Sequence, residues 1–143
     1  MINIIWPNLV GVLVATVVSF VIGAIWFAPQ VFGKTWLALL GKTEEWARKN
    51  RNKSIVFGFL ANLLTAFLLG FFIASLGSHN WFDGVEVAFL AWLAFPAAIH
   101  FTSYVFEGRP GKLFGIDVVH SLIIFLVMGA ILGYWSTAPT IAY

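Results

Sequence analysis

The stretch that decides the fold is Ile99–Ser121, IHFTSYVFEGRPGKLFGIDVVHS. An apolar run ends at Phe106, a short basic segment reverses the chain, and a second apolar run begins at Leu113. The two runs are predicted to be antiparallel helices that cross a membrane and meet at this hairpin. Two histidines and an aspartate interrupt them, although apolar residues would cost less free energy in lipid. The rest of the chain likewise consists of long apolar runs joined by more polar segments.

The composition is that of a chain embedded in lipid. Of the 143 residues, 61% are hydrophobic and 10% are charged, and the mean hydropathy is +0.94. A soluble domain carries about 25% charged residues, so water would not dissolve this surface. The length suits one domain, residues 1–143. Cysteine is absent, which excludes disulfides, thiolate metal sites and cysteine nucleophiles.

Four apolar stretches are long enough to cross a hydrocarbon core, which takes about 20 helical residues. They are Leu9–Phe27, Ile55–Leu76, Val85–Phe106 and Leu113–Trp135. Backbone polar groups in lipid must be bonded within their own segment, and the alternation typical of barrel strands is missing, so helices are predicted. The expected fold is all-α: a polytopic bundle of four transmembrane helices, with short interfacial helices in the first cytoplasmic loop.

The placement of charge predicts the orientation. All eight Lys and Arg residues lie in two segments, six between spans one and two and two between spans three and four. The terminal tails and the segment between spans two and three contain none. The positive-inside rule therefore places both basic segments in the cytoplasm and both termini outside. The expected partner is the lipid bilayer, and no nucleic acid is expected, because the charges mark topology rather than a groove-binding surface.

The first cytoplasmic segment is expected to hold two short helices on the inner membrane surface. KTWLALLG, residues 34–41, predicts an amphipathic piece. Thr43 is predicted to N-cap a second piece, with Glu44 and Glu45 in its first turn, where acidic groups suit the helix dipole. Its basic side is expected to face anionic lipid.

The second cytoplasmic segment, Glu107–Lys112, is expected to be a tight turn. Pro110 and Gly111 are predicted to occupy the two central places of a type II turn, since proline fixes φ and glycine accepts a positive φ. Glu107 and Arg109 are expected to pair beside it.

Tryptophans cluster at the predicted membrane edges. Indole rings prefer the headgroup layer, so these residues are interpreted as an aromatic belt and not as a cofactor-stacking site. The outer set is Trp6, Trp81 and Trp135, and the inner set is Trp26, Trp36 and Trp46.

Small residues recur at every fourth position along two spans and close a third. Small side chains let helix backbones approach closely, which matters in lipid because no hydrophobic force draws helices together. These stripes are predicted to be packing faces, either within one subunit or, for one stripe, between copies of the chain. They comprise Gly11, Ala15, Ser19 and Gly23; Gly58, Asn62, Ala66, Gly70 and Ala74; and Gly129 and Gly133.

Each span also contributes a polar residue at a similar depth in the inner leaflet. Counting about 1.5 Å per residue from the inner ends places these residues about 6–12 Å deep. Asp117 and His120, three apart, share a helix face. Pro96 is expected to kink span three one turn before His100. The predicted polar layer comprises Ser19, Asn62, His100, Asp117, His120 and Ser121.

Ionisable groups at this depth cost a few kcal/mol unless paired, which makes them candidates for function. In one hypothesis, a proton relay or a site for a small cation or polar solute is formed by Asp117, His120 and His100. In a second hypothesis, His100 and His120 are the axial ligands of a haem. A metal is a third, but two His and one Asp are a thin ligand set, so no metal is predicted. The alternative to all three is interhelical hydrogen bonding, with Asp117 held by the helix dipole and by Lys112 or Arg109.

Catalytic motifs are missing from the sequence. It contains no GxSxG, HExxH or phosphate-binding loop and no paired intramembrane carboxylates. An enzyme is not expected, and no cofactor is expected apart from the haem alternative.

Three stretches together resemble a known family: IGAIWFAPQVFGKTWLALLGKTEE (residues 22–45), VFEGRPGKLFGID (105–117) and LVMGAILGYW (126–135). They are similar to the small bacterial inner-membrane proteins of the domain-of-unknown-function family 1761. The resemblance implies a four-span fold in the bacterial inner membrane and no assigned activity. Span four departs from the family pattern, which tends to have Asn and an aromatic residue near the positions of Asp117 and His120.

Two functions are therefore expected of such a chain. The first is a small oligomeric transporter- or channel-like protein that uses the polar layer, since four helices rarely enclose a route of their own. The alternative is a non-catalytic accessory or structural subunit that packs against a larger membrane complex. The expected protein partners are copies of the chain or other membrane subunits.

Overall fold

Four helical spans make up the computed structural model, which describes residues 5–136. They are α1 (Leu9–Trp26), α3 (Glu44–Ser75), the α4–η2–α5 segment (Trp81–Trp92, Leu93–Ala97 and Ala98–Phe106) and α6 (Gly111–Tyr134). A π-helical turn, η1 (Pro29–Gly33), and the short helix α2 (Lys34–Leu39) connect α1 to α3. No strand occurs in this part of the chain. The predicted all-α bundle of four long apolar helices is confirmed.

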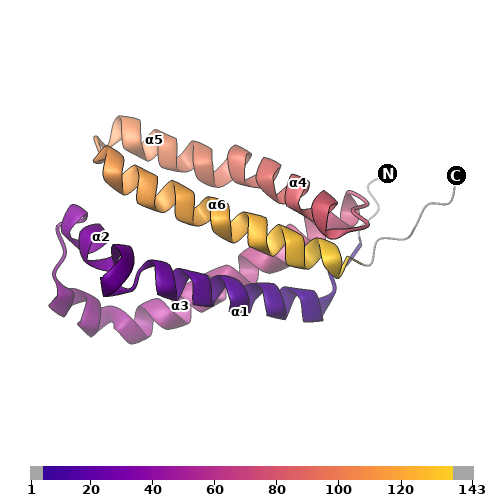
Figure 1. Ribbon diagram of the computed structural model, residues 1–143, viewed down its shortest axis with the longest axis horizontal. Helices are drawn as coiled ribbons and strands as arrows, with labels where there is room; N and C mark the ends of the chain where they lie inside the picture. The colour runs from indigo at the N-terminus through magenta and orange to yellow at the C-terminus, as the bar shows by residue number, and fades with distance from the viewer. Residues whose placement is uncertain (1–4, 137–143) are drawn as a thin grey trace, which may run out of the picture.

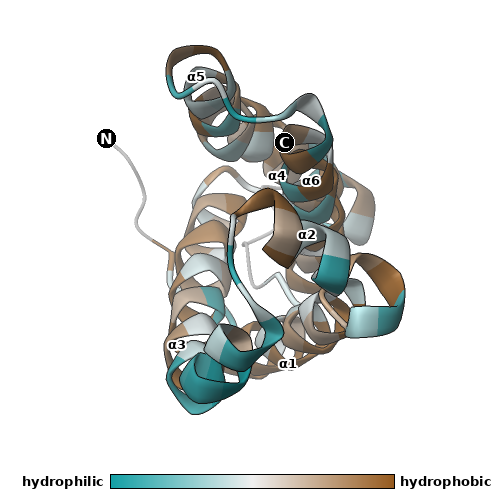
Figure 2. Cartoon of the chain, turned by 90° about the vertical axis from the view of Figure 1, so that its left-hand side faces the viewer, coloured by the Kyte–Doolittle hydropathy of each residue, from teal (hydrophilic) through white to brown (hydrophobic). Residues whose placement is uncertain are grey.

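Helix α6 is the central element of the bundle. It packs against α1, α3, α4 and α5, and Figure 1 shows it between the α4–α5 span and α1. The α5–α6 turn and α2 lie at one end of the molecule, whereas the α3–α4 turn, the start of α1 and the end of α6 lie at the other (Figure 1). Seen from the first end, the hydrophilic segments gather around α2 and the start of α3 (Figure 2). We call this the basic end. Residues 1–4 and 137–143, on which part of the topology prediction rests, lie outside the described residues.

Capping side chains fix where three helices begin. The Asn8 side chain accepts hydrogen bonds from the backbone N–H groups of Val10 and Gly11, and Asn80 caps α4 in the same way. The Thr43 hydroxyl accepts from the Trp46 N–H, as predicted for an N-cap. Each cap satisfies N–H groups that a helix start leaves unbonded.

Helix α3 differs from its prediction. The expected second interfacial helix is not separate, because the helix capped by Thr43 continues without a break to Ser75. Residues 44–57 contain neither glycine nor proline, and their Glu, Lys and Arg residues favour helix, so nothing ends it before the apolar stretch. The first loop therefore contributes one separate short α-helix, α2, which packs against α3 and α6.

Pro96 distorts the third span at the predicted place. Proline lacks an N–H and clashes with the preceding turn, and a wider turn relieves both problems. The structure forms the π-helical turn Leu93–Ala97 around Pro96, and α5 follows directly.

The turn at the basic end also differs from its prediction. Gly111 is the first residue of α6 and does not have a positive φ, so the type II turn centred on Pro110 and Gly111 is wrong. Gly108, with a φ of 64°, is the left-handed residue that ends α5. The expected pair is present, because Arg109 Nε donates to Glu107 Oε2 at 2.7 Å. The hydrogen bond from Arg109, and to a smaller extent one from Ser103, lowers the pKa of the Glu107 carboxyl group.

The core lies between α1, α3, α4 and α6. Its closest approach is between α4 and α6, where Gly84 lies directly against Gly129 and Gly133: a methyl group added at Gly84 would come within 2.7 Å of the Gly133 Cα. Backbones approach this closely only where side chains are absent. The buried hydrophobic residues are Val12, Ala15, Ala66, Leu69, Ile73, Ala88, Ile124, Met128 and Leu132.

The outer surface of the bundle is apolar. Side chains such as Phe57, Leu64, Leu90 and Phe106 are mostly exposed, and the four helices are long and apolar enough to cross a membrane. A soluble monomer rarely exposes so much apolar surface, whereas lipid covers it without cost. The chain is a membrane protein.

Candidate functional site

Helix α2 brings a tryptophan to the start of α6. Figure 2 shows α2 at the centre of the basic end, between α3 and the α5–α6 pair. From there the Trp36 indole Nε1 donates a 2.9 Å hydrogen bond to Asp117 Oδ1. A carboxylate that accepts an N–H gains a charge-assisted bond. Asp117 is thus bonded by an indole and not by the expected Lys112 or Arg109, the latter of which pairs with Glu107.

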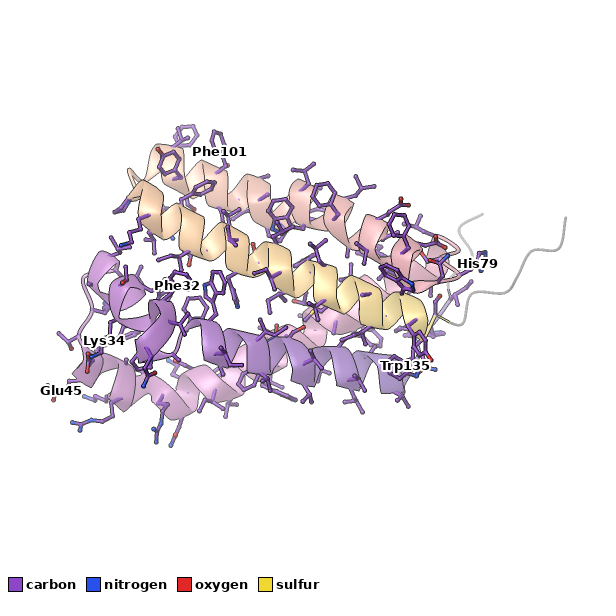
Figure 3. All side chains as sticks on the ribbon, in the orientation of Figure 1. Phe32, Lys34, Glu45, His79, Phe101 and Trp135 are labelled. Carbon is purple, nitrogen blue, oxygen red and sulfur yellow. The ribbon has the colours of Figure 1, made fainter. Side chains whose placement is uncertain are left out.

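Aromatic rings surround His120, one turn further along α6. The Phe27 ring lies edge-on to the imidazole with centroids 4.8 Å apart, and the Trp26 ring lies at 5.9 Å. Phe27 also contacts Trp36 at 5.0 Å, and Trp26 contacts Phe32 at 4.5 Å. Figure 3 shows Phe32 next to α6. The aromatic group links the end of α1, η1 and α2 to one face of α6.

Three buried polar atoms in this region have no hydrogen-bond partner: Ser19 Oγ, Trp26 Nε1 and His120 Nε2. Ser19 is fully buried. His120 Nε2 lies 3.3 Å from where a Cβ on Gly23 would stand, so the absence of a side chain there makes room for the imidazole. Ser19 is one turn before Gly23 on the same face of α1. We call Ser19, Trp26, Trp36, Asp117 and His120 the His120 site.

The unpartnered atoms define what this site can bind. Each buried polar atom left unbonded costs about 1–3 kcal/mol, and native structures leave few of them. The indole can only donate, the hydroxyl can donate and accept, and the imidazole does either according to its tautomer. Each of these atoms can bond to water or to a small solute that carries an oxygen acceptor and an O–H or N–H donor.

Ser121 lies outside the His120 site, although it follows His120 in the sequence. The Trp92 indole donates to its hydroxyl at 3.0 Å, and that hydroxyl donates to the Val118 carbonyl at 2.9 Å. Ser121 therefore bonds toward α4, whereas the His120 ring contacts residues of α1.

His100 and Asn62 are placed apart from the unpartnered atoms. Tyr104 stacks on Phe114 at 5.1 Å, and the helices are antiparallel, so His100 is level with the turn of Asp117 but on α5, which packs on α6 and not on α1. Asn62 is half-buried on α3. Gly58, one turn before it, contacts Phe20, which places Asn62 farther from the basic end than Ser19.

This arrangement bears on the haem and metal hypotheses. The His120 ring packs against Trp26, the last residue of α1, and Phe27, which follows it. A haem held between the two histidines stays a prediction. Within residues 5–136, no three His, Asp or Glu side chains gather closely enough to hold a metal ion.

The predicted packing residues lie close to other segments of the same chain. A Cβ on Gly11 would meet the Trp135 side chain at 2.8 Å, and one on Gly70 would meet Pro7 at 2.9 Å. Ala15, Ala66 and Ala74 are buried. Association of copies through one of these stripes stays a prediction.

Sequence reasoning missed the aromatic part of the site. The sequence predicts Trp26 and Trp36 only as parts of a membrane-edge belt, whereas in the structure Trp26 also contacts His120 and Trp36 donates a hydrogen bond to Asp117. The available signal was the density of aromatic residues around Pro29, in the segment that carries the most specific family resemblance. No periodic pattern connects Trp36 with a partner 81 residues away.

The fold and the site together define a small four-helix membrane protein with a polar and aromatic site at one end of its bundle. Residues 10–133 match the family model described as "Protein of unknown function (DUF1761)", and the chain belongs to this family, as its resemblance predicted. The match includes the segment of Trp26 and Trp36 and the helix of Asp117 and His120. Searches of curated proteins and of solved structures gave no match.

Proposed function

We propose that the protein is a small transporter- or channel-like protein that works as an oligomer in the bacterial inner membrane. The His120 site lies in the inner leaflet and receives protons or a small polar solute. The observation that carries this proposal is the set of unpartnered buried atoms Ser19 Oγ, Trp26 Nε1 and His120 Nε2 beside the Asp117–Trp36 hydrogen bond. Polar groups inside a membrane are costly, and solute and proton pathways are where membrane proteins place them.

The need for an oligomer follows from the packing farther from the basic end. There, Ile73 and Met128 are fully buried, and Gly84 closes on Gly129. A route through one subunit would have to pass this dry contact. Copies that associate through the exposed apolar faces of α3 or α5 would instead enclose a route between them.

The second candidate, an accessory subunit of a larger complex, is favoured by helix α5. None of its residues is buried, and it packs on α6 alone among the long helices. Ile99 and Phe101 are exposed on it. In an accessory subunit, a partner helix would cover this face.

Flux measurements with reconstituted protein test the transport proposal. Vesicles holding a pH-sensitive dye report proton flux, and light scattering reports uptake of urea or glycerol. We expect flux above that of empty vesicles, reduced at least tenfold by His120→Gln and by Asp117→Asn. His79→Gln is the matched control, because His79 is exposed in the α3–α4 turn, and it should leave flux unchanged. Absence of flux for every solute, together with co-purification of unrelated membrane chains, would favour the accessory role.

The orientation can be tested with single cysteines, because the chain has none of its own. Lys49→Cys at the basic end should be protected from an impermeant maleimide in intact cells. His79→Cys at the opposite end should react. The reverse pattern would overturn the proposed orientation.

A further inference from the structure

A cavity of about 570 Å³ opens at the basic end, between η1–α2 and the first turns of α3. It is separate from the unpartnered atoms of the His120 site. One wall is apolar and includes Phe27, Pro29 and Leu37. The other wall is charged and includes Glu45, Arg48 and Arg51. The volume lies within the range of about 300–1,000 Å³ typical of small-molecule sites.

Some of the charged residues that line this cavity form an ion pair with each other, and the others do not. Lys34 and Glu44, which also line it, form an ion pair at 3.5 Å. Glu45, Arg48 and Arg51 have no ion pair among the described residues. Figure 3 shows Lys34 and Glu45 at this same end of the molecule. The residues of this wall that are left without an ion pair are therefore two arginines and one glutamate.

The position of the cavity relative to the apolar helices fits a lipid headgroup. Arg51 precedes the start of the apolar stretch of α3 at Ile55 by four residues, or about 6 Å of helix. Phe27 directly follows α1. The charged wall is therefore at the level where headgroups lie, and the apolar wall continues toward the acyl chains.

We propose that this cavity binds the headgroup of an aminophospholipid of the phosphatidylethanolamine type. Arg48 and Arg51, three residues apart on one face of α3, hold the phosphate, since guanidinium groups match phosphate oxygens in pairs. Glu45, one turn earlier, accepts hydrogen bonds from the primary ammonium group. The apolar wall of Phe27 and Leu37 contacts the glycerol and the first acyl carbons. A free phosphate ion would use the arginines but neither the carboxylate nor the apolar wall.

The test is native mass spectrometry of the purified full chain with phosphatidylethanolamine, phosphatidylglycerol and phosphatidylcholine supplied in equal amounts. We expect phosphatidylethanolamine to be retained most. Arg48→Gln combined with Arg51→Gln should lower retention of all three at least tenfold, as expected for lost charge-assisted bonds. Glu45→Gln should remove the preference for phosphatidylethanolamine over phosphatidylcholine, which lacks N–H donors, and leave phosphatidylglycerol bound. Lys49→Gln is the matched control, because Lys49 is an exposed cation on the same helix that does not line the cavity.

Three outcomes would overturn the proposal. Loss of lipid in the Lys49 variant equal to that in the double arginine variant would mean diffuse attraction and no site. Unchanged preference in the Glu45 variant would remove the ammonium contact. Displacement of lipid by inorganic phosphate at millimolar concentration, with equal binding of phosphate alone, would assign the cavity to a free anion. All the substituted side chains are exposed, so circular dichroism should show every variant folded.

Discussion

Adding one methyl group at Gly84 should separate the two most closely packed helices. The Cβ of Gly84→Ala would overlap the Gly129 carbonyl oxygen and lie 2.7 Å from the Gly133 Cα. Both atoms belong to the helix backbone of α6 and cannot rotate away as a side chain could. Restoring ordinary contacts of about 3.5 Å to both atoms requires α4 and α6 to move apart by about 1 Å.

The magnitude follows from the contacts that this separation weakens. A gap of about 0.5–1 Å forfeits a quarter to a half of each dispersion contact, each worth about 0.1–0.2 kcal/mol. An interface with as many atom contacts as one buried leucine, about 40–60, would lose about 2 kcal/mol, in line with measured costs of overpacking. Gly129→Ala should cost a similar amount, because its Cβ would lie 2.6 Å from the Gly84 carbonyl oxygen. One separation relieves both clashes, so the double variant should cost less than the sum of the two.

Unfolding in mixed micelles of dodecyl maltoside and SDS, followed by circular dichroism, measures this effect. Gly115→Ala is the control on α6, because a methyl group there meets nothing within 4 Å. That variant should be as stable as the wild type or slightly more stable. If Gly84→Ala and Gly129→Ala unfold at the same SDS fraction as Gly115→Ala, the close backbone contact and the reasoning built on it are refuted.

Three further predictions use the same assay or amide exchange. Trp36→Phe removes the N–H that bonds Asp117 and should cost about 1–3 kcal/mol, whereas Asp117→Asn keeps an acceptor oxygen and should cost less. Gly108→Ala should cost about 1–2 kcal/mol because its φ is 64°, whereas Gly111→Ala, at the first residue of α6, should be near neutral. Thr43→Ala should cost about 1 kcal/mol and speed amide exchange in residues 44–47.

Each of these has a result that would contradict it. Equal stability of the wild type and the Trp36 variant would mean that the indole hydrogen bond contributes nothing. Equal losses of stability for Gly108→Ala and Gly111→Ala would favour the type II turn at Pro110 and Gly111 that the sequence predicts. Unchanged exchange after loss of the Thr43 hydroxyl would mean that α3 begins later than its cap.

The spans were predictable because their signals are local. Apolar length locates the bilayer crossings, and the cap at Thr43 is predicted from a single residue and the charges that follow it. The start of α3 shows the limit of such signals. Hydropathy changes at Ile55, where lipid begins, but the helix begins at Glu44, since hydropathy reports the surroundings of a helix and not its ends.

The candidate site was predictable in depth but not in direction. Counting residues along a span gives the level of a side chain, and it brought Ser19, Asp117 and His120 to neighbouring levels. It could not show that His120 contacts the end of α1 while Ser121, the next residue, bonds to Trp92 of α4. Direction depends on how α6 is rotated, and rotation is set by contacts between residues distant in sequence.

The rotation of α6 is set by its glycines. Gly129 lies nine residues after His120, and at about 100° per residue the two point to opposite sides of the helix. The contact of Gly129 with Gly84 holds one side of α6 against α4, and the opposite side then presents His120 to Gly23 and the aromatic rings. A methyl group at Gly129 should therefore disturb the His120 site from about 13 Å away along the helix, without touching it. Fluorescence of variants in which Trp26 is the one remaining tryptophan tests this. Gly129→Ala should shift the emission maximum of Trp26, whereas Gly115→Ala should not. Equal spectra for the two variants would mean that the Gly129–Gly84 contact does not influence the His120 site.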